Sequence, residues 1–272
     1  MVDYWDVTFN LNKTYMDELH QRADDCGFTD FINTAMTFPP SGPLPSPPSP
    51  NSKKCNNIWS DIISAAQEFN PCWDVYDLTT TCPNLWDVLG FPGSFYYEPA
   101  PWIYFNRTDV QKAINAPQQN WEECSSGVLD KDTSAPSSFV VLPRVIEKNE
   151  RTIIGHGMAD FILLVNGTIM AVQNMTWGGS QGFGTAPSEW NDFYVPYHSE
   201  LNLGSTAGAG VMGSWWTERG FTLVTVDLSG HMVPQYQPSA AYRQVEYLLG
   251  RIDNLGVVSD FTTQKGDFGN NP

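Results

Sequence analysis

The sequence predicts an α/β fold whose sheet is mostly parallel. Two stretches each combine a short β-rich run, a polar loop and a helical pattern; the first begins at residues 152–154 and the second at residues 221–226. Parallel strands need crossover connections that contain helices, and successive units of this kind form one sheet. Hydrophobic residues make up 41% of the 272 residues, which is enough for a sizeable core and argues against global disorder.

The first hundred residues show helical patterns and a proline-rich connection. A helical pattern covers residues 15–22, and seven prolines among residues 39–50 predict an exposed, passive polyproline-like loop. Residues 55–98 carry Cys55, Cys72 and Cys82 and many aromatic side chains, and we expect helices and little sheet there. We therefore divide the chain into an insertion or cap region, residues 1–100, and a core region, residues 101–272.

Helix boundary signals mark the first and last helices after residue 100. Thr108 and Gln111 have the T-x-x-Q spacing of a capping box, and Pro117 ends that helix. Ser239 is a suitable cap for the last helix, which ends at Gly250. Between these helices the patterns predict a strand at 152–154, a helix over 161–172 and a strand at 221–226.

The charge balance excludes two classes of partner. Fourteen Lys and Arg against thirty Asp and Glu give a formal net charge of −16. Nucleic acids and anionic membranes present phosphate groups that would repel such a chain, so we expect neither as a partner. The longest apolar run, residues 161–165, falls far short of the roughly 18 residues that a membrane span requires. An acidic surface with little total charge suits a protein that works at low pH.

Four Asn-x-Ser/Thr sequons favour the secretory pathway. They stand at Asn12, Asn106, Asn166 and Asn174 and predict N-glycosylation. The first 15 residues lack the basic and apolar regions of a signal peptide. We therefore expect a secreted or vacuolar, lysosome-like protein whose export signal lies on sequence absent from this chain.

Five cysteines predict disulfides with one cysteine left over. Cys26, Cys55, Cys72 and Cys82 allow two bridges in three connectivities, of which we favour the nested pair Cys26–Cys82 and Cys55–Cys72. The isolated Cys124 is then a buried free thiol or a bridge to a polypeptide outside this chain. No cysteine or histidine cluster has zinc-ligand spacing, so we expect no metal.

The candidate chemistry follows the two strands of the parallel pair. Asp160 and His231 lie in the loops after residues 152–154 and 221–226, and ligands of parallel sheets bind beyond the carboxyl ends of the strands. An Asp followed by a His is the order of the second and third members of a Ser…Asp…His triad. Histidine activates the serine as a base, and the carboxylate orients the imidazole and stabilises its charged form.

The nucleophile of such a triad is missing from its expected place. Residues 178–182 match G-x-S-x-G, but the segment before them ends a helix and the segment after them cannot begin one. Ser180 also follows Asp160 in the chain, which is the wrong order. We therefore reject Ser180 as the nucleophile.

The other histidines show no ligand pattern. His156 lies four residues before Asp160, but the segment between them is loop-like, so the two are not a helical ligand pair. His20 and His198 are expected in solvent, and no third ligand is evident. We expect no metal and no cofactor.

Several segments resemble the serine carboxypeptidases of the α/β-hydrolase fold. Residues 174–183 (NMTWGGSQGF) are similar to the filamentous-fungal branch of that family in particular. The segments that carry the resemblance are 104–117 with 121–124, 151–168, 174–183 and 220–238.

The resemblance implies roles for single residues. Asp160 and His231 correspond to the second and third triad members, Met232 to a wall of the pocket for the leaving C-terminal residue, and Ile162 to a contact of the side chain before the scissile bond. Cys124 corresponds to a cysteine that, in members of the family, forms a bridge to the N-terminal half of the protein.

The resemblance also implies what this chain lacks. The nucleophile elbow, the oxyanion-hole amides and the carboxylate-binding network of the family are not in the sequence, and Met158 replaces an acidic residue that often precedes the triad Asp. We therefore expect the C-terminal part of an α/β-hydrolase fold with a disulfide-stapled, proline-rich helical insertion. We expect residues 101–272 to be the C-terminal half of its core and the N-terminal half to be missing.

The expected activity is that of a serine-type carboxypeptidase, which releases C-terminal amino acids from peptide or protein C-termini at acidic pH. Two alternatives stay open. One is a catalytically inactive fragment or pseudoenzyme, and the other is a non-peptidase relative such as an acyltransferase or hydroxynitrile lyase.

Overall fold

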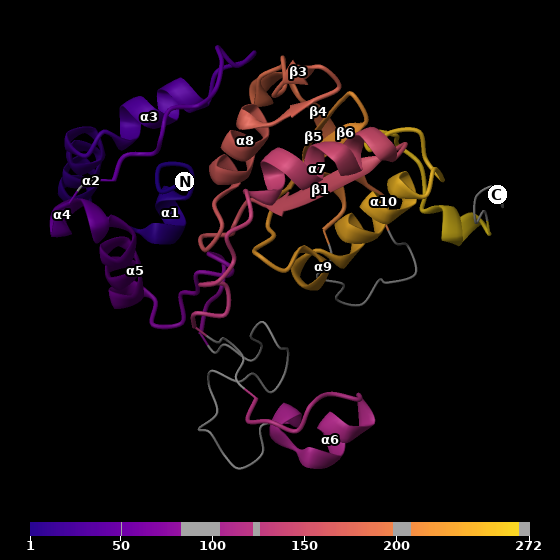
Figure 1. Cartoon of the computed structure of the whole chain (residues 1–272), viewed down its shortest axis with the longest axis horizontal. Helices are drawn as coiled ribbons and strands as arrows, with labels where there is room; N and C mark the ends of the chain where they lie inside the picture. The colour runs from indigo at the N-terminus through magenta and orange to yellow at the C-terminus, as the bar shows by residue number, and fades with distance from the viewer. Residues whose placement is uncertain (50, 83–103, 122–125, 198–207, 267–272) are drawn as a thin grey trace. The chain divides into compact units, whose positions relative to one another are not determined.

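The computed structural model describes residues 1–49, 51–82, 104–121, 126–197 and 208–266 (Figure 1). The chain forms two compact units, one of Met1–Cys82 with Pro136–Pro272 and one of Pro83–Ala135. These boundaries are not those of the expected regions 1–100 and 101–272, and that division stays a prediction. All of the candidate site lies in the first unit.

A four-stranded sheet forms the centre of the first unit (Figure 1). Strands β1 and β6 are parallel, as predicted, whereas β5 is antiparallel to both of its neighbours. The described sheet is thus more mixed than the mostly parallel sheet that we expected. In spatial order its strands are β1 (Thr152–Gly157), β6 (Phe221–Val226), β5 (Gly210–Glu218) and β4 (Asn191–Val195).

A tight turn explains the antiparallel pair that the sequence patterns missed. Arg219 and Gly220 separate β5 from β6, and their φ angles are 50° and 78°. Two left-handed residues are the requirement of a type I′ turn, whose twist matches that of an antiparallel hairpin. The turn therefore folds β5 back along β6.

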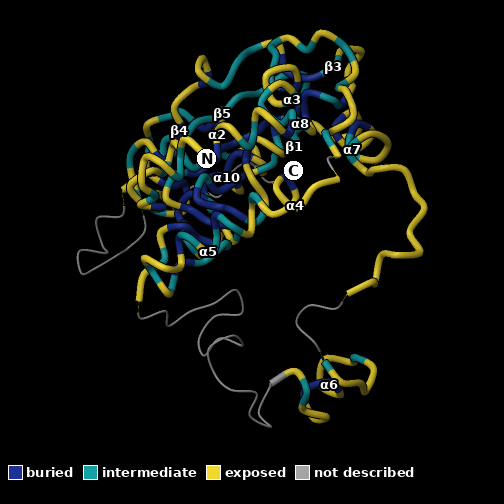
Figure 2. The backbone as a smooth tube through the Cα atoms, turned by 90° about the vertical axis from the view of Figure 1, so that its left-hand side faces the viewer, coloured by how far each residue is buried: buried dark blue, intermediate teal, exposed yellow. Residues whose placement is uncertain are grey.

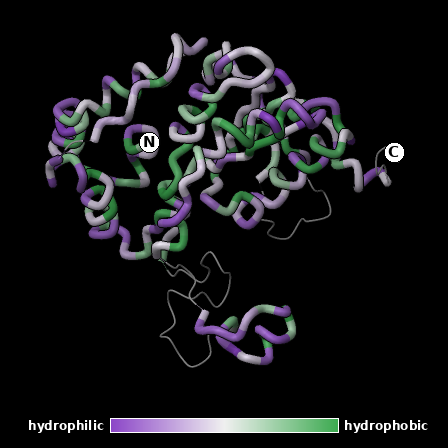
Figure 3. Tube along the Cα trace, viewed as in Figure 1, coloured by the Kyte–Doolittle hydropathy of each residue, from purple (hydrophilic) through white to green (hydrophobic). Residues whose placement is uncertain are grey.

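Strand β6 is buried on both faces along its whole length. Val224 and Val226 belong to one apolar cluster, and the alternate residues Phe221 and Leu223 belong to another. Figures 2 and 3 show the buried and hydrophobic residues gathered in this sheet region. The helices on the two faces are α10 (Pro238–Leu248) on the first and α7 (Ser137–Lys148) with α8 (Val165–Asn174) on the second.

Two predicted helix starts are wrong for local reasons. The helix expected over 161–172 begins at Val165, because the preceding residues form a loop around the carboxylate of Asp160. The last helix begins at Pro238 with Gln237 as its N-cap, so Ser239 lies inside the helix and is not its cap. Its end before Gly250 agrees with the prediction.

The second unit contains α6 (Thr108–Ala113), which begins where the sequence predicted but ends before Pro117, with Asn115 in the left-handed region (φ 58°). The capping box is wrong, because the N-cap is Arg107 and makes no side-chain cap bond. Gln111 is buried instead, and its amide donates to the carbonyl oxygens of Phe105 and Gln119. The same unit holds the 3₁₀ turn η1 (Tyr104–Asn106).

The N-terminal helices enclose an apolar cluster of their own, which includes Phe9, Leu19, Ile62, Trp73 and Leu78. The predicted pattern over 15–22 lies within the second of these helices. They are α1 (Asp6–Phe9), α2 (Lys13–Asp25), α3 (Phe28–Ala35), α4 (Lys53–Asn56) and α5 (Ile58–Phe69).

The proline-rich connection has neither helix nor strand over residues 39–49. It is attached to the body of the unit, because the amide of Leu44 donates to Asn174 and the side chain of Gln181 donates to the carbonyl of Gly42. The short elements are β2 (Thr176–Trp177), β3 (Ser180–Gln181), η2 (Pro187–Glu189), α9 (Val233–Tyr236) and η3 (Thr262–Lys265). Within the described residues, no helix combines the length and hydropathy that a membrane crossing needs.

The four expected cysteines form two disulfides, but the favoured nested pairing is wrong. Cys26 pairs with Cys55, and Cys72 pairs with Cys82. The first bridge joins the end of α2 to α4, which pack together. The second closes a short turn that Asn70 also closes through a hydrogen bond to the carbonyl of Thr80. Cys124 lies outside the described residues.

Digestion of the unreduced protein should yield one linked peptide pair with Cys26 and Cys55 and another with Cys72 and Cys82. A peptide that links Cys26 to Cys82 would contradict the structure. Replacing Cys26 and Cys55 together by Ser should lower the free energy of unfolding by about 3.5 kcal/mol, because the bridge closes a 29-residue separation. The matched Cys72→Ser and Cys82→Ser pair should cost less, since its separation is 10 residues.

Candidate active site

Asp160 and His231 meet beyond the carboxyl ends of the two parallel strands. Nδ1 of His231 lies 2.8 Å from Oδ2 of Asp160. The Asp160 side chain is 5% exposed and the His231 side chain 30% exposed. Because a carboxylate oxygen accepts, the imidazole carries its proton on Nδ1 and keeps Nε2 as a base.

The second carboxylate oxygen of Asp160 is bound by its own loop. The backbone amides of Ile162 and Leu163 each donate to Oδ1 at 2.9 Å. Both oxygens of this buried carboxylate therefore have hydrogen-bond partners, which offset the cost of its burial. Because the two backbone amides bind Oδ1, the other oxygen, Oδ2, is left to accept the hydrogen bond from His231.

The residues on either side of Asp160 are buried in the cluster of the N-terminal helices. Ala159 is fully buried and Phe161 is 2% exposed. The ring of Phe161 stacks on Trp59 with centroids 6.2 Å apart and meets the rings of Phe9 and Trp73 edge-on at 5.2 and 5.5 Å. These contacts anchor the loop by its apolar side chains.

Two tryptophans also hold the loop by its backbone. Nε1 of Trp5 donates to the carbonyl of Met158 at 3.0 Å, and Nε1 of Trp59 donates to the carbonyl of Phe161 at 3.1 Å. The two tryptophans thus bind the backbone on each side of Asp160.

Residues 75–78 run between the two site loops and bind both of them. Phe161 N donates to the carbonyl of Val75 at 2.9 Å, and Leu78 N donates to the carbonyl of Ala159 at 3.0 Å. On the other side, His231 N donates to the carbonyl of Tyr76 at 2.7 Å. The backbone of this segment therefore sets the separation of the loops that carry Asp160 and His231.

Two glycines permit the close approach of these backbones. A Cβ on Gly157 would overlap the carbonyl oxygens of Ser229 and Gly230. A Cβ on Gly230 would overlap the carbonyl oxygen of Tyr76. Both glycines are thus required by the lack of space and not by their φ angles.

Burial shifts the pKa of two groups around the pair. Desolvation lowers the pKa of His156, with its hydrogen bond to Leu163 and the charge of Asp160 acting in the opposite direction. Desolvation raises the pKa of Asp77, although its bonds to the amide and hydroxyl of Thr79 oppose that rise. The site therefore favours a neutral His156 and makes ionisation of Asp77 harder.

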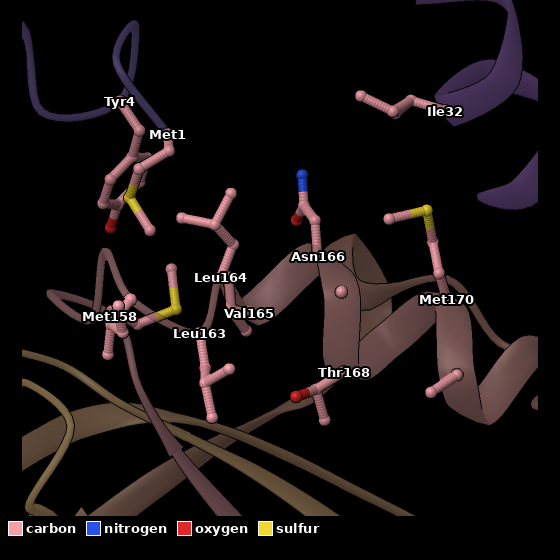
Figure 4. Close-up of a pocket in the computed structure, with 13 residues that line it drawn as sticks. Met1, Tyr4, Ile32, Met158, Leu163, Leu164, Val165, Asn166, Thr168 and Met170 are labelled. Carbon is pink, nitrogen blue, oxygen red and sulfur yellow. The ribbon is translucent and has the colours of Figure 1, made fainter. Parts of the chain in front are cut away.

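Met232 and Ile162 lie next to the pair in sequence. Met232 follows His231, is 37% exposed and is the N-cap residue of α9. Ile162 lines an apolar cavity of about 770 Å³. Figure 4 shows this cavity, with Met1, Tyr4 and the start of α8 among its surroundings. The contacts of Met232 and Ile162 with substrate stay predictions. Other residues of the cavity are Met1, Tyr4, Ile32, Met158, Leu163 and Met170.

Ser180 lies on the β2–β3 hairpin at the far end of the sheet. The guanidinium of Arg219, in the turn just before β6, stacks on Trp177 of this hairpin at 4.2 Å from the ring centroid. Asp160 and His231 follow the opposite end of β6, and a six-residue strand rises roughly 20 Å. This arrangement agrees with the rejection of Ser180 as the nucleophile.

The sequon asparagines differ in their surroundings. Asn12 caps α2, Asn106 accepts from the amide of Trp121, and Asn174 accepts from the amide of Leu44. Asn166 is exposed beside the cavity (Figure 4). Glycosylation at all four stays a prediction.

His20 and His198 were expected in solvent, and no metal site was expected. His20 lies on the surface with its Nε2 2.8 Å from a carboxylate oxygen of Asp3, and His198 is outside the described residues. In the part of the chain that the structure describes, no group of three or more His, Cys, Asp or Glu could hold a metal ion.

Sequence reasoning missed two parts of the site. It gave His156 no role, although both of its ring nitrogens are hydrogen-bonded. It also gave no role to residues 75–78, whose contribution comes from backbone atoms. The glycines that flank His156 and precede His231 were the available signal, because a glycine marks close backbone approach.

The structure places an Asp–His pair beyond the carboxyl ends of two parallel strands of an α/β fold, and comparison with known proteins gives the family. The family model of the serine carboxypeptidases matches residues 10–251. The chain is 52% identical over 258 residues to a probable serine carboxypeptidase of Arthroderma benhamiae, which covers 93% of this chain and 48% of that protein. It is 40% identical over 264 residues to serine-type carboxypeptidase F of Aspergillus niger. That match covers 91% of this chain and 50% of that protein.

The chain therefore belongs to the serine carboxypeptidase family. It spans about half the length of the curated relatives that it matches. Among solved structures, a prohormone-processing carboxypeptidase from Saccharomyces cerevisiae is similar with a TM-score of 0.53 at 19% identity, covering 90% of this chain and 50% of that one. That likeness supports the α/β-hydrolase fold.

Replacing Gly230 by Ala should lower the free energy of unfolding by about 2 kcal/mol or more, because the new Cβ must displace the backbone of Tyr76. Chemical denaturation measures this loss. Gly167 is the matched control: it lies in α8 with open space around it, so Gly167→Ala should raise stability by up to about 1 kcal/mol. Equal effects of the two substitutions would contradict the close approach at Gly230.

Proposed function

We propose that this chain supplies the acid–base part of a serine-type carboxypeptidase, which releases C-terminal amino acids from peptides and proteins. The observation that carries the proposal is the 2.8 Å contact between His231 and a buried Asp160 in a chain of this family. The residues chosen from the sequence as the second and third triad members are the two that meet.

In this mechanism His231 acts through Nε2. It takes the proton of a serine hydroxyl as the serine oxygen attacks the carbonyl carbon of the last peptide bond. The imidazolium then gives the proton to the leaving amine, the peptide bond breaks, and an acyl-enzyme remains. His231 next takes a proton from water, which attacks the acyl group, and it returns that proton to the serine oxygen as the acyl–serine bond breaks.

Asp160 orients the imidazole and stabilises its positive charge without becoming protonated. The serine must come from outside the described residues, because Ser180, the one G-x-S-x-G serine, lies at the opposite end of β6. We expect this serine on a partner portion of the protein, and Cys124 is the residue that we expect to bridge to it.

The remaining parts of the proposal concern substrate and setting. Met232 would line the pocket of the leaving residue, and Ile162 would contact the side chain before the scissile bond. The net charge of −16 suits an acidic compartment, and the two disulfides are typical of a secreted or lumenal protein. A vacuolar or secreted location and glycans at the four sequons belong to the same proposal.

One alternative has an observation in its favour. The described residues hold no serine that we can assign as nucleophile, which also fits a catalytically inactive fragment or pseudoenzyme. An acyltransferase or hydroxynitrile lyase would share the same Asp160 and His231, and substrate assays separate it from a peptidase.

A chimera tests the proposal. In the Arthroderma benhamiae relative, the segment that matches this chain is replaced by the 272 residues, and release of the C-terminal amino acid from a blocked dipeptide is measured at acidic pH. His231→Ala or Asp160→Ala should lower kcat by roughly 10⁴-fold. The matched control His20→Ala should leave kcat unchanged, because His20 lies on the surface beside Asp3.

Two results would count against the proposal. One is a chimera that folds and binds the dipeptide but turns it over no faster than its His231→Ala variant. The other is covalent labelling of the isolated 272-residue chain by a fluorophosphonate, since that chain should hold no activated serine.

A further inference from the structure

His156 is a buried histidine that the proposed mechanism does not use. It lies on β1 opposite Thr225 of β6 and is 8% exposed. Nε2 lies 2.8 Å from the carbonyl oxygen of Leu163, and Nδ1 lies 2.9 Å from the hydroxyl oxygen of Thr168 on α8. Both ring nitrogens are therefore engaged.

The partners of His156 determine its tautomer. A carbonyl oxygen can only accept, so Nε2 must carry the proton and donate to Leu163. Nδ1 of the neutral ring then accepts from the hydroxyl of Thr168. Desolvation, which lowers the pKa of His156, favours this neutral form. Asp160 and His231 are the charged or titratable groups that act on it electrostatically.

The residue that His156 holds is also a ligand of the Asp160 carboxylate. Leu163 accepts from His156 through its carbonyl and donates through its amide to Oδ1 of Asp160 at 2.9 Å. A continuous chain of hydrogen bonds thus leads from Thr168 through His156, Leu163 and Asp160 to His231.

Apolar packing does not hold Leu163 in place. Leu163 is 59% exposed and the next residue, Leu164, is 37% exposed. Phe161, on the other side of the loop, is only 2% exposed. Figure 4 shows Leu163 and Thr168 on the segment that carries the start of α8. The bond from His156 therefore supplies the restraint that burial supplies at Phe161.

We propose that His156 is a positioning residue for Asp160. By fixing Leu163, it keeps the Leu163 amide on Oδ1 and so keeps Oδ2 directed at Nδ1 of His231. The proposal rests on the proposed role of the Asp160–His231 pair, and it adds a residue that touches neither substrate nor the reacting atoms.

The readout is the Nδ1 proton of His231, observed by NMR in the full 272-residue chain with ¹⁵N-labelled histidine. His156→Phe keeps a planar ring without a donor, and it should make this proton exchange with solvent about fivefold faster, the factor that an ordinary hydrogen bond supplies. His156→Gln should restore the wild-type rate, because its amide can donate to Leu163 and accept from Thr168. Thr168→Val should change the rate by less than about twofold, since the bond to Leu163 remains.

The outcomes separate positioning from a merely structural role. A His156→Phe protein that melts cooperatively at a lower temperature with an unchanged His231 signal would overturn the proposal. If His156→Phe does not fold, the wild-type chain decides: the proposal requires His156 in the Nε2–H tautomer with the Leu163 amide protected from exchange. A proton on Nδ1 of His156, or an unprotected Leu163 amide, would overturn it.

This test is independent of the proposed function. The His231 signal reports geometry and not turnover, so an inactive chimera would leave it unchanged. Conversely, a chimera could be active while no His156 substitution changes the exchange of the His231 Nδ1 proton. That result would support the carboxypeptidase proposal and refute the positioning role of His156.

Discussion

The burial of Phe161 in the aromatic cluster of the N-terminal helices is the interaction on which the site depends. Its ring meets Phe9, Trp59 and Trp73, and full burial of such a side chain contributes about 1.5–3 kcal/mol. Because Asp160 is the adjacent residue, the same burial places its carboxylate at the end of β1. The N-terminal helices and the sheet are thereby joined at the residue that orients His231. A change in the packing of those helices is therefore a change in the site.

Around this anchor, most of the geometry is set by backbone atoms. The parallel register of β1 and β6 brings the two loops to the same edge of the sheet, and Gly157 and Gly230 let them approach each other. Residues 75–78 then bind both loops through backbone hydrogen bonds. On the exposed side of the loop that carries Asp160, the hydrogen bond from His156 to Leu163 takes the place of apolar packing. The arrangement has the features of a preorganised site, in which rigid surroundings fix the functional pair before substrate binds.

The sequence predicted the features that depend on local pattern and missed those that depend on packing. The runs at 152–154 and 221–226 predicted the parallel pair, and the polar loops after them predicted where Asp160 and His231 would meet. The disulfide pairing was missed because it follows from the packing of α2 on α4, which no local pattern encodes. The start of α8 was missed because side-chain bonds from Asp160 to its own loop compete with helix formation.

The most direct test of this account is the protonation pattern of His231 in the isolated chain. NMR of ¹⁵N-labelled histidine identifies which ring nitrogen carries the proton at neutral pH. The account predicts the Nδ1–H tautomer with a slowly exchanging proton, and loss of that slow exchange in Asp160→Ala. An Nε2–H tautomer in the wild-type chain, or a signal that Asp160→Ala leaves unchanged, would contradict the claim that the chain itself assembles the Asp160–His231 pair.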